Sequence, residues 1–233
     1  EHVAIDIPGL KGEYEPKLYT GIIDYNGYLF FVGTQRSAIL KMNKKTRIFE
    51  ICMADNYHAN SNLFILNKRG TACSVGNKIY LPIDSDDMIC IYDMDTDKYI
   101  YKQIGDHHNR FNTIIFADDA FWLTGSKNEI IMWKENTEEV KKIDSFPREF
   151  SNDKKSGDNC VFSRVSLFYD KLYYAPLNAN MVMAFDLETG STSQIGDYIK
   201  PGNKCYTIKQ LNDELLFLQI ENSDFEALFD IYI

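Results

Sequence analysis

A four-residue turn that ends in threonine recurs along this chain. Its copies are NKKT at 43–46, DMDT at 93–96, KENT at 134–137 and DLET at 186–189. An apolar stretch precedes each copy, and a fifth such stretch, ALFDIYI, ends the sequence. An Asn or Asp three places before the threonine can accept hydrogen bonds from backbone N–H groups of the turn. The motif therefore predicts one hairpin that is repeated along the chain.

A second, tighter turn joins two strand-like stretches upstream of each threonine turn. Its second residue marks each unit, and these markers are Gly27, Asn77, Asp119, Asp170 and Asp213. The markers are 50, 42, 51 and 43 residues apart. Each unit then reads as strand, tight turn, strand, loop, strand, threonine turn and strand. A period of about 45 residues with four strands per unit is typical of a β-propeller blade, which buries its faces against its neighbours.

The number of blades depends on the two ends of the chain. The fifth unit stops after its third strand at Ile233, and the chain opens with a strand-like stretch, HVAID, that belongs to no complete unit. We expect residues 2–7 to pair beside 227–233, which would hide two exposed edges. This predicts an all-β single domain over 1–233, with five four-stranded antiparallel blades closed by the N-terminal strand. Because the chain begins with Glu1 rather than methionine, a trimmed chain with six or seven blades is the alternative.

Two apolar columns follow the markers and predict packing between blades. The first column contains Leu29, Ile79, Phe121, Leu172 and Leu215, and the second contains Phe30, Tyr80, Trp122, Tyr173 and Leu216. We expect these aromatic side chains to be structural rather than to stack on a ligand.

Two stretches carry a family resemblance. NKIYLPIDSDDMICIYDMDTDKY and KLYYAPLNANMVMAFDLETGS resemble kelch-like units, and MAFDLETG is also similar to repeats in bacterial quinoprotein-type and lyase-type propellers. The double glycine that usually ends the second kelch strand is absent here: Val32-Gly33 comes nearest, and Leu81-Pro82 and Ala175-Pro176 replace it elsewhere. The resemblance implies a kelch-like repeat protein of bacterial origin. It transfers no activity and no site residue, because propellers carry unrelated functions.

Charge and cysteine spacing exclude several classes of function. The net charge of −9 opposes binding to nucleic acid or to an anionic membrane, and no apolar run approaches the roughly 18 residues of a membrane span. The five cysteines form no CxxC pair, so we expect free thiols in a reducing compartment, with the cytoplasm preferred. We expect no cofactor and no metal site. The cysteines are Cys52, Cys73, Cys90, Cys160 and Cys205.

In such a fold, one end of the propeller carries the loops between blades and the loops between second and third strands. We call this end the loop face. Its connections between blades are expected at 52–69, 105–110, 144–160 and 196–204, with long and short connections in alternation. Long loops on a rigid scaffold are the usual place for recognition, so we expect the ligand there.

A basic pattern recurs at the entry to the first strands. Three units carry Asn followed by Lys or Arg at the same distance before the marker. With two neighbouring arginines, the predicted site comprises Asn67, Lys68, Arg69, Asn109, Arg110, Arg164, Asn203 and Lys204. A ring of such groups would bind a carboxylate, a phosphate or an acidic peptide. The alternative is that each cation pairs with a loop aspartate.

Catalytic patterns are weaker. The predicted first strands contain one carboxylate, Asp24, which lies at the opposite end from the loop face. This disfavours a glycosidase, which needs two converging carboxylates. His107 and His108 are adjacent, and in an extended segment they would point opposite ways. We interpret DSDD at 84–87 as a solvated acidic loop, with a calcium site as the alternative.

The sequence thus predicts a rigid propeller platform that recognises a protein segment or a glycan, with an anionic ligand as one possibility, on the loop face. The alternative is a lyase or hydrolase with an active site on the same face, built from His107 or His108 and loop acids.

Overall fold

The computed structural model describes residues 19–33, 38–54, 71–83, 85–152, 160–200, 204–210, 216–221 and 227–232. In this part of the chain every regular element is a β-strand. No helix there has the length and apolar character that crossing a membrane requires.

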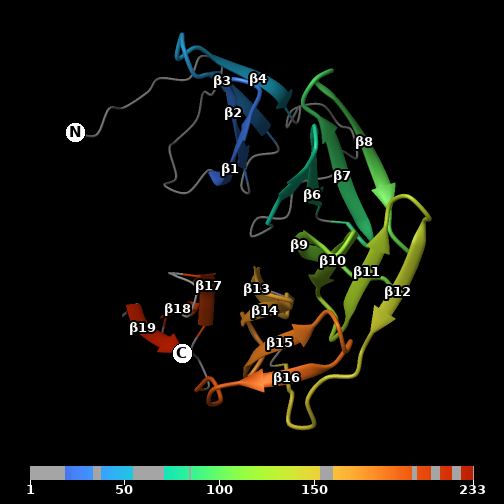
Figure 1. Cartoon of the computed structure of the whole chain (residues 1–233), viewed down its shortest axis with the longest axis vertical. Helices are drawn as coiled ribbons and strands as arrows, with labels where there is room; N and C mark the ends of the chain where they lie inside the picture. The colour runs from blue at the N-terminus through green and yellow to red at the C-terminus, as the bar shows by residue number, and fades with distance from the viewer. Residues whose placement is uncertain are drawn as a thin grey trace.

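The strands form five antiparallel sheets in chain order (Figure 1). The first contains β1 (Tyr19–Tyr25), β2 (Tyr28–Gly33), β3 (Ala38–Asn43) and β4 (Phe49–Ala54). The second contains β5 (Cys73–Val75), β6 (Lys78–Pro82), β7 (Met88–Asp93) and β8 (Lys98–Gln103). The third contains β9 (Phe111–Ala117), β10 (Ala120–Gly125), β11 (Ile130–Lys134) and β12 (Glu139–Ile143). The fourth contains β13 (Phe162–Phe168), β14 (Lys171–Pro176), β15 (Val182–Asp186) and β16 (Thr192–Ile195). The fifth contains β17 (Lys204–Gln210), β18 (Leu216–Glu221) and β19 (Ala227–Tyr232).

The sheets follow one another around a common axis, with the first strands toward the centre and the last strands outside (Figure 1). The predicted all-β propeller with four-stranded antiparallel blades is therefore confirmed for the first four sheets. The fifth sheet shows three strands in its described residues. The expected partner strand at 2–7 lies outside the described residues, so closure by the N-terminal strand stays a prediction.

Both kinds of predicted turn are present. Asn26 and Gly27 join β1 to β2 with φ angles of 46° and 82°, as the tight hairpin turns require. In the threonine turns, the Oδ1 atom of Asn43 accepts hydrogen bonds from the N–H groups of Lys45 (2.9 Å) and Thr46 (3.0 Å). The copies that begin with Asn43, Asp93 and Asp186 thus cap their own turns, as predicted, whereas the copy that begins with Lys134 has no such acceptor.

Apolar clusters fill the interfaces between consecutive sheets, which we call seams. The first–second seam includes Phe30, Ile39, Ile79 and Tyr92. The second–third seam includes Tyr80, Phe111, Phe121 and Trp133. The third–fourth seam includes Trp122, Phe162, Leu172 and Phe185. The fourth–fifth seam includes Ala175, Val182, Cys205 and Ile208. The described members of the predicted columns, apart from Leu29, lie in these seams, which confirms their structural role. Leu215 and the side chain of Leu216 lie outside the described residues.

Side-chain bonds also join the first strands of neighbouring sheets. β9 and β13 each carry a bulge, at Asn112 and Ser163, where one extra residue enters the strand. The amide of Asn112 donates to the carbonyl of Phe162 (2.6 Å), and the hydroxyl of Ser163 donates to the carbonyl of Cys205 (2.5 Å). Each bulge therefore ties its sheet to the next one near the axis, which makes this part of the scaffold rigid.

Candidate functional site

The predicted basic residues are only partly within the described chain. Asn67, Lys68, Arg69 and Asn203 lie outside the described residues. Lys204 is the first residue of β17, and its side chain is not described. The structure therefore places Asn109, Arg110 and Arg164, which have three different environments.

The loop at 105–110 is folded around a buried carboxylate. Asp87 is 2% exposed and accepts hydrogen bonds from the backbone N–H groups of His107 (2.8 Å), His108 (2.6 Å) and Asn109 (3.1 Å). Gly105 begins this loop with a φ of 76°, a conformation that glycine adopts without strain. The interpretation of 84–87 as a solvated acidic loop is therefore wrong for Asp87, because backbone donors take the place of water around it.

His108 corrects a second expectation. Its φ of 51° shows that the two histidines lie in a turn and not in an extended segment. Its ring nitrogens lie 3.9 Å from carboxylate oxygens of Asp86 and of Asp106. The side chain of His108 is 76% exposed, so water screens these interactions. Asp87, Asp106 and His108 could each offer one atom to a metal ion, but the Asp87 oxygens already accept three N–H groups.

Asn109 is a fully buried part of the same loop. Its amide donates to the carboxylate of Glu129 (3.0 Å), which is itself buried. Gly125 faces it closely, because a Cβ atom there would lie 2.3 Å from Asn109 Oδ1 and 2.1 Å from the carbonyl oxygen of Arg110. Asn109 therefore holds the loop against the third sheet.

Arg110 lies on the surface of the loop face. Its Nε donates to Asp86 Oδ1 at 3.3 Å, and its side chain is 55% exposed. This pairing is the alternative that the sequence left open for the basic residues. Exposed pairs of this kind contribute about 0–1 kcal/mol to stability.

Arg164 differs from Arg110 in its exposure to solvent and in its partners. It directly follows the bulge at Ser163 on β13 and pairs with Ala175 of β14, on the side of the sheet that packs against Cys205 and Ile208 of β17. Its side chain is half-buried, and burial lowers the pKa of its guanidinium. Within the part of the chain that the structure describes, Arg164 has no carboxylate and no hydrogen-bond partner.

One group of structural residues was missed in the sequence although a signal exists for it. Asp87, Asn128 and Asn180 each lie six residues before the first residue of a threonine turn. The side chain of Asn180 accepts from the N–H of Ser151 (2.9 Å) and donates to the carbonyl of Glu149 (2.8 Å), as Asp87 binds its own loop. An Asx residue at this position thus anchors a connection between sheets.

Comparisons with known proteins support the fold. No protein-family model matches the chain, and no curated protein matches it. Virginiamycin B lyase from Staphylococcus aureus is similar in structure, with a TM-score of 0.63 at 11% identity over 93% of this chain and 70% of that one. An extracellular domain assigned to a hybrid two-component system of B. thetaiotaomicron has a TM-score of 0.64 at 13% identity, over 93% of this chain and 26% of that one.

A second structure of the extracellular domain of the same B. thetaiotaomicron protein, there assigned to a one-component system, has a TM-score of 0.62 at 10% identity, over 91% of this chain and 27% of that one. The chain therefore spans about a quarter of the B. thetaiotaomicron chain in each of these two structures. At these identities the likeness concerns the fold alone, and this fold occurs both in a lyase and in an extracellular domain. The kelch-like assignment stays a prediction.

Proposed function

We propose that this protein is a rigid β-propeller binding module, which recognises a protein segment or a glycan at the loop face through an anionic group of the ligand. The observation that carries this proposal is Arg164, a half-buried guanidinium without a carboxylate partner among the described residues.

The physical argument starts from desolvation. A cation taken partly out of water loses hydration energy, and a nearby anion is the usual compensation. The guanidinium of Arg164 offers a planar set of donors that matches a carboxylate or a phosphate. Its strand is tied to the neighbouring sheets by the bonds of Asn112 and Ser163, so the backbone that carries the donor is fixed before the ligand arrives. Preorganisation of this kind favours affinity because little conformational freedom is lost on binding.

A titration with inorganic phosphate and with N-acetylaspartate tests the proposal. We expect the Nε–H signal of Arg164 to shift in NMR spectra, and Arg164→Ala to weaken binding about 10- to 100-fold, as the loss of a charge-assisted hydrogen bond does. Binding should also weaken as ionic strength rises. Arg148→Ala is the matched control, because Arg148 is exposed in the connection between β12 and β13.

An unchanged Arg164 signal, or equal effects of Arg164→Ala and Arg148→Ala, would contradict the proposal. Once an anion is bound, peptide and glycan arrays that carry carboxylate or phosphate groups identify which class of ligand is used.

The second candidate is an enzyme of the lyase or hydrolase kind. The observation in its favour is His108, whose ring lies between the carboxylates of Asp86 and Asp106 at 3.9 Å from each. Such an arrangement can move a proton, although the exposure of the ring leaves its charges screened by water. If His108→Ala abolishes turnover of a substrate found by screening and leaves the phosphate titration unchanged, the enzyme function stands beside the binding function.

A further inference from the structure

The end of the propeller opposite the loop face carries the two kinds of turn, and we call it the turn face. At two seams, an acid of the later sheet meets donors of the earlier sheet there. In the second–third seam, Glu135 accepts hydrogen bonds from Lys78 Nζ (3.0 Å) and Tyr80 Oη (2.6 Å). In the first–second seam, Tyr25 Oη donates to Asp95 at 3.0 Å. Both seams therefore end in hydrogen bonds at the turn face.

The third–fourth seam lacks these donors. In each of the first four sheets one pair of residues flanks the tight turn, and the four pairs are Tyr25–Tyr28, Val75–Lys78, Ala117–Ala120 and Phe168–Lys171. The third sheet thus has two alanines where its neighbours have larger or basic side chains. Trp122 takes the position of Tyr80, but its Nε1 donates within its own sheet, to the carbonyl of Ala117 (3.0 Å).

The missing donors leave an acid of the fourth sheet without a partner. Glu188 occupies the position in its turn that Asp95 has in the second sheet. Among the described residues, its carboxylate has no hydrogen-bond or ion-pair partner, and the same holds for the carboxylates of Asp118 and Asp170. The nearby Lys171 is already paired with Asp186 at 3.4 Å. The seam therefore ends in three unneutralised carboxylates.

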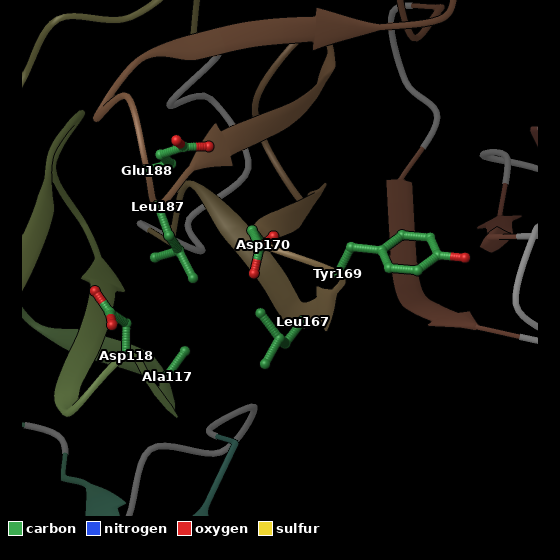
Figure 2. A pocket seen from close by; sticks show the side chains of 7 residues that line it. All are labelled: Ala117, Asp118, Leu167, Tyr169, Asp170, Leu187 and Glu188. Atoms are coloured by element: carbon green, nitrogen blue, oxygen red, sulfur yellow. The ribbon is translucent and has the colours of Figure 1, made fainter.

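A pocket of about 430 Å³ lies where the donors are missing. Figure 2 shows its side chains, which come from the ends of β9 and β13 and from the β9–β10, β13–β14 and β15–β16 turns. Ala117, Leu167 and Leu187 supply the apolar part of the lining, and Asp118, Asp170 and Glu188 supply the acidic part. The ring of Tyr169 extends away from the others (Figure 2). This volume lies within the range of pockets that hold small ligands.

We propose that this pocket binds a primary ammonium group carried on an alkyl chain, as found in aliphatic diamines and in lysine side chains. The ammonium would take the place that the Tyr25 hydroxyl fills beside Asp95 in the first–second seam, and the alkyl chain would lie on Leu167 and Leu187. A cation is favoured because the pocket lining contains three acids and no base. The net charge of −9 also attracts cations from solution. This site is separate from the proposed anion site, because it lies on the turn face.

The test is an NMR titration of the full chain with cadaverine. We expect shifts at residues 117–118, 167–170 and 187–188, and weaker or no shifts with the diol of the same length. Glu188→Gln should weaken binding about fivefold, the size of one exposed ion pair. Glu149→Gln is the matched control, because it makes the same change of charge at an exposed residue in the β12–β13 connection.

A variant with a larger side chain in the pocket tests whether the amine binds there. Ala117→Tyr copies Tyr25 of the first sheet into the third sheet, and it should abolish cadaverine binding if its circular dichroism shows a folded protein. Should this variant fail to fold, the comparison of Glu188→Gln with Glu149→Gln still decides. Equal binding of diamine and diol, equal effects of the two glutamine variants, or full binding by folded Ala117→Tyr overturns the proposal.

A second arm identifies the source of the ammonium group. If a lysine flanked by blocked peptide bonds binds more tightly than cadaverine, the site takes a side chain of a partner protein. If cadaverine binds more tightly, the site takes a free amine. Both results support the proposal.

Discussion

The second–third seam and the third–fourth seam have the same architecture and end differently at the turn face. Both bury aromatic clusters between two four-stranded sheets, and both are anchored at the loop face by an Asx side chain, Asp87 in one and Asn180 in the other. At the turn face, the first of these seams ends in hydrogen bonds to Glu135, whereas the second ends in a pocket beside Glu188.

The difference shows that a repeat fold does not determine whether a site exists. The backbone register is the same in both sheets, since Val75 pairs with Lys78 as Ala117 pairs with Ala120. The side chains at each seam differ: Glu135, the second residue of its turn, meets Lys78 and Tyr80. The fourth sheet has Leu187 at that position and Glu188 one place later, where the third sheet offers only Ala117. A repeat protein can therefore form a binding site by losing a structural contact in one unit.

The largest expected effect comes from the aromatic residue that precedes the first residue of the threonine turn. Trp133 is fully buried in the second–third seam and stacks on Phe121 with ring centres 5.0 Å apart, and Phe185 is its counterpart in the third–fourth seam. We expect Trp133→Ala to lower the free energy of unfolding by about 4 kcal/mol and Phe185→Ala by about 3 kcal/mol, because both leave cavities. Urea denaturation measures both, and a loss below 1 kcal/mol for either would show that its seam is not a packed core.

The anchors at the loop face come next. Asp87→Ala leaves three backbone N–H groups without an acceptor and should cost about 3 kcal/mol, whereas Asn180→Ala breaks two neutral bonds and should cost about 1 kcal/mol. Thermal unfolding by calorimetry ranks the two variants. A reversed order would mean that the carboxylate is not the stronger anchor.

The hydroxyl of Tyr80 tests the closed end of the second–third seam directly. Tyr80 is buried, and burial, together with the hydrogen bond to Glu135, raises the pKa of its phenol. Tyr80→Phe should cost about 1.5 kcal/mol, because it removes a hydrogen bond to a charged group.

Adding a tyrosine hydroxyl at the third–fourth seam is the reverse change, and it should raise the free energy of unfolding. Ala117→Tyr should raise stability by up to about 1 kcal/mol if its hydroxyl reaches Glu188. Urea denaturation measures Tyr80→Phe and Ala117→Tyr. If both are less stable than the wild type, the third–fourth seam cannot form the bond between a tyrosine hydroxyl and an acid that its neighbour forms.

The smallest effect concerns the threonine turns and their pH dependence. The N–H of Thr96 lowers the pKa of Asp93, and the N–H of Thr189 lowers the pKa of Asp186. A carboxyl whose pKa is depressed by folding stabilises the protein above its unfolded pKa of about 3.9, and this contribution disappears as the pH falls through the folded pKa. We expect Asp93→Ala and Asp186→Ala to lower the melting temperature by about 2–4 °C at pH 7.

The difference in melting temperature between the wild type and each variant should vanish below the folded pKa values of Asp93 and Asp186, where these carboxyl groups are protonated in the wild type. Asp93 accepts two N–H groups of its turn, at 3.0 Å and 2.9 Å, and Asp186 accepts that of Thr189 at 2.8 Å, so the effect at Asp93 should be the larger. A difference in melting temperature that persists unchanged into acid would rule out the carboxylate as its source.

The sequence by itself determined the features that depend on neighbours along the chain. The tight turn at Asn26–Gly27 and the caps of Asn43 and Asp93 follow from residues two or three positions apart, so their pattern predicts them. Alternating apolar residues likewise predict which side of a strand is buried, as Phe30 shows. Together these local rules were enough for the strand order, the period and the all-β propeller.

Only the tertiary structure decided which side chains of different sheets meet. Asp86 and Arg110 are 24 residues apart in sequence and form an ion pair, while Arg164 has no partner among the described residues. The pocket beside Glu188 exists because residues of the fourth sheet face the small side chain of Ala117 in the third. A repeat fixes the position of each residue within its own blade. Whether side chains of two neighbouring blades match in charge and size depends on which of them meet across the seam, and the packing of the blades decides this.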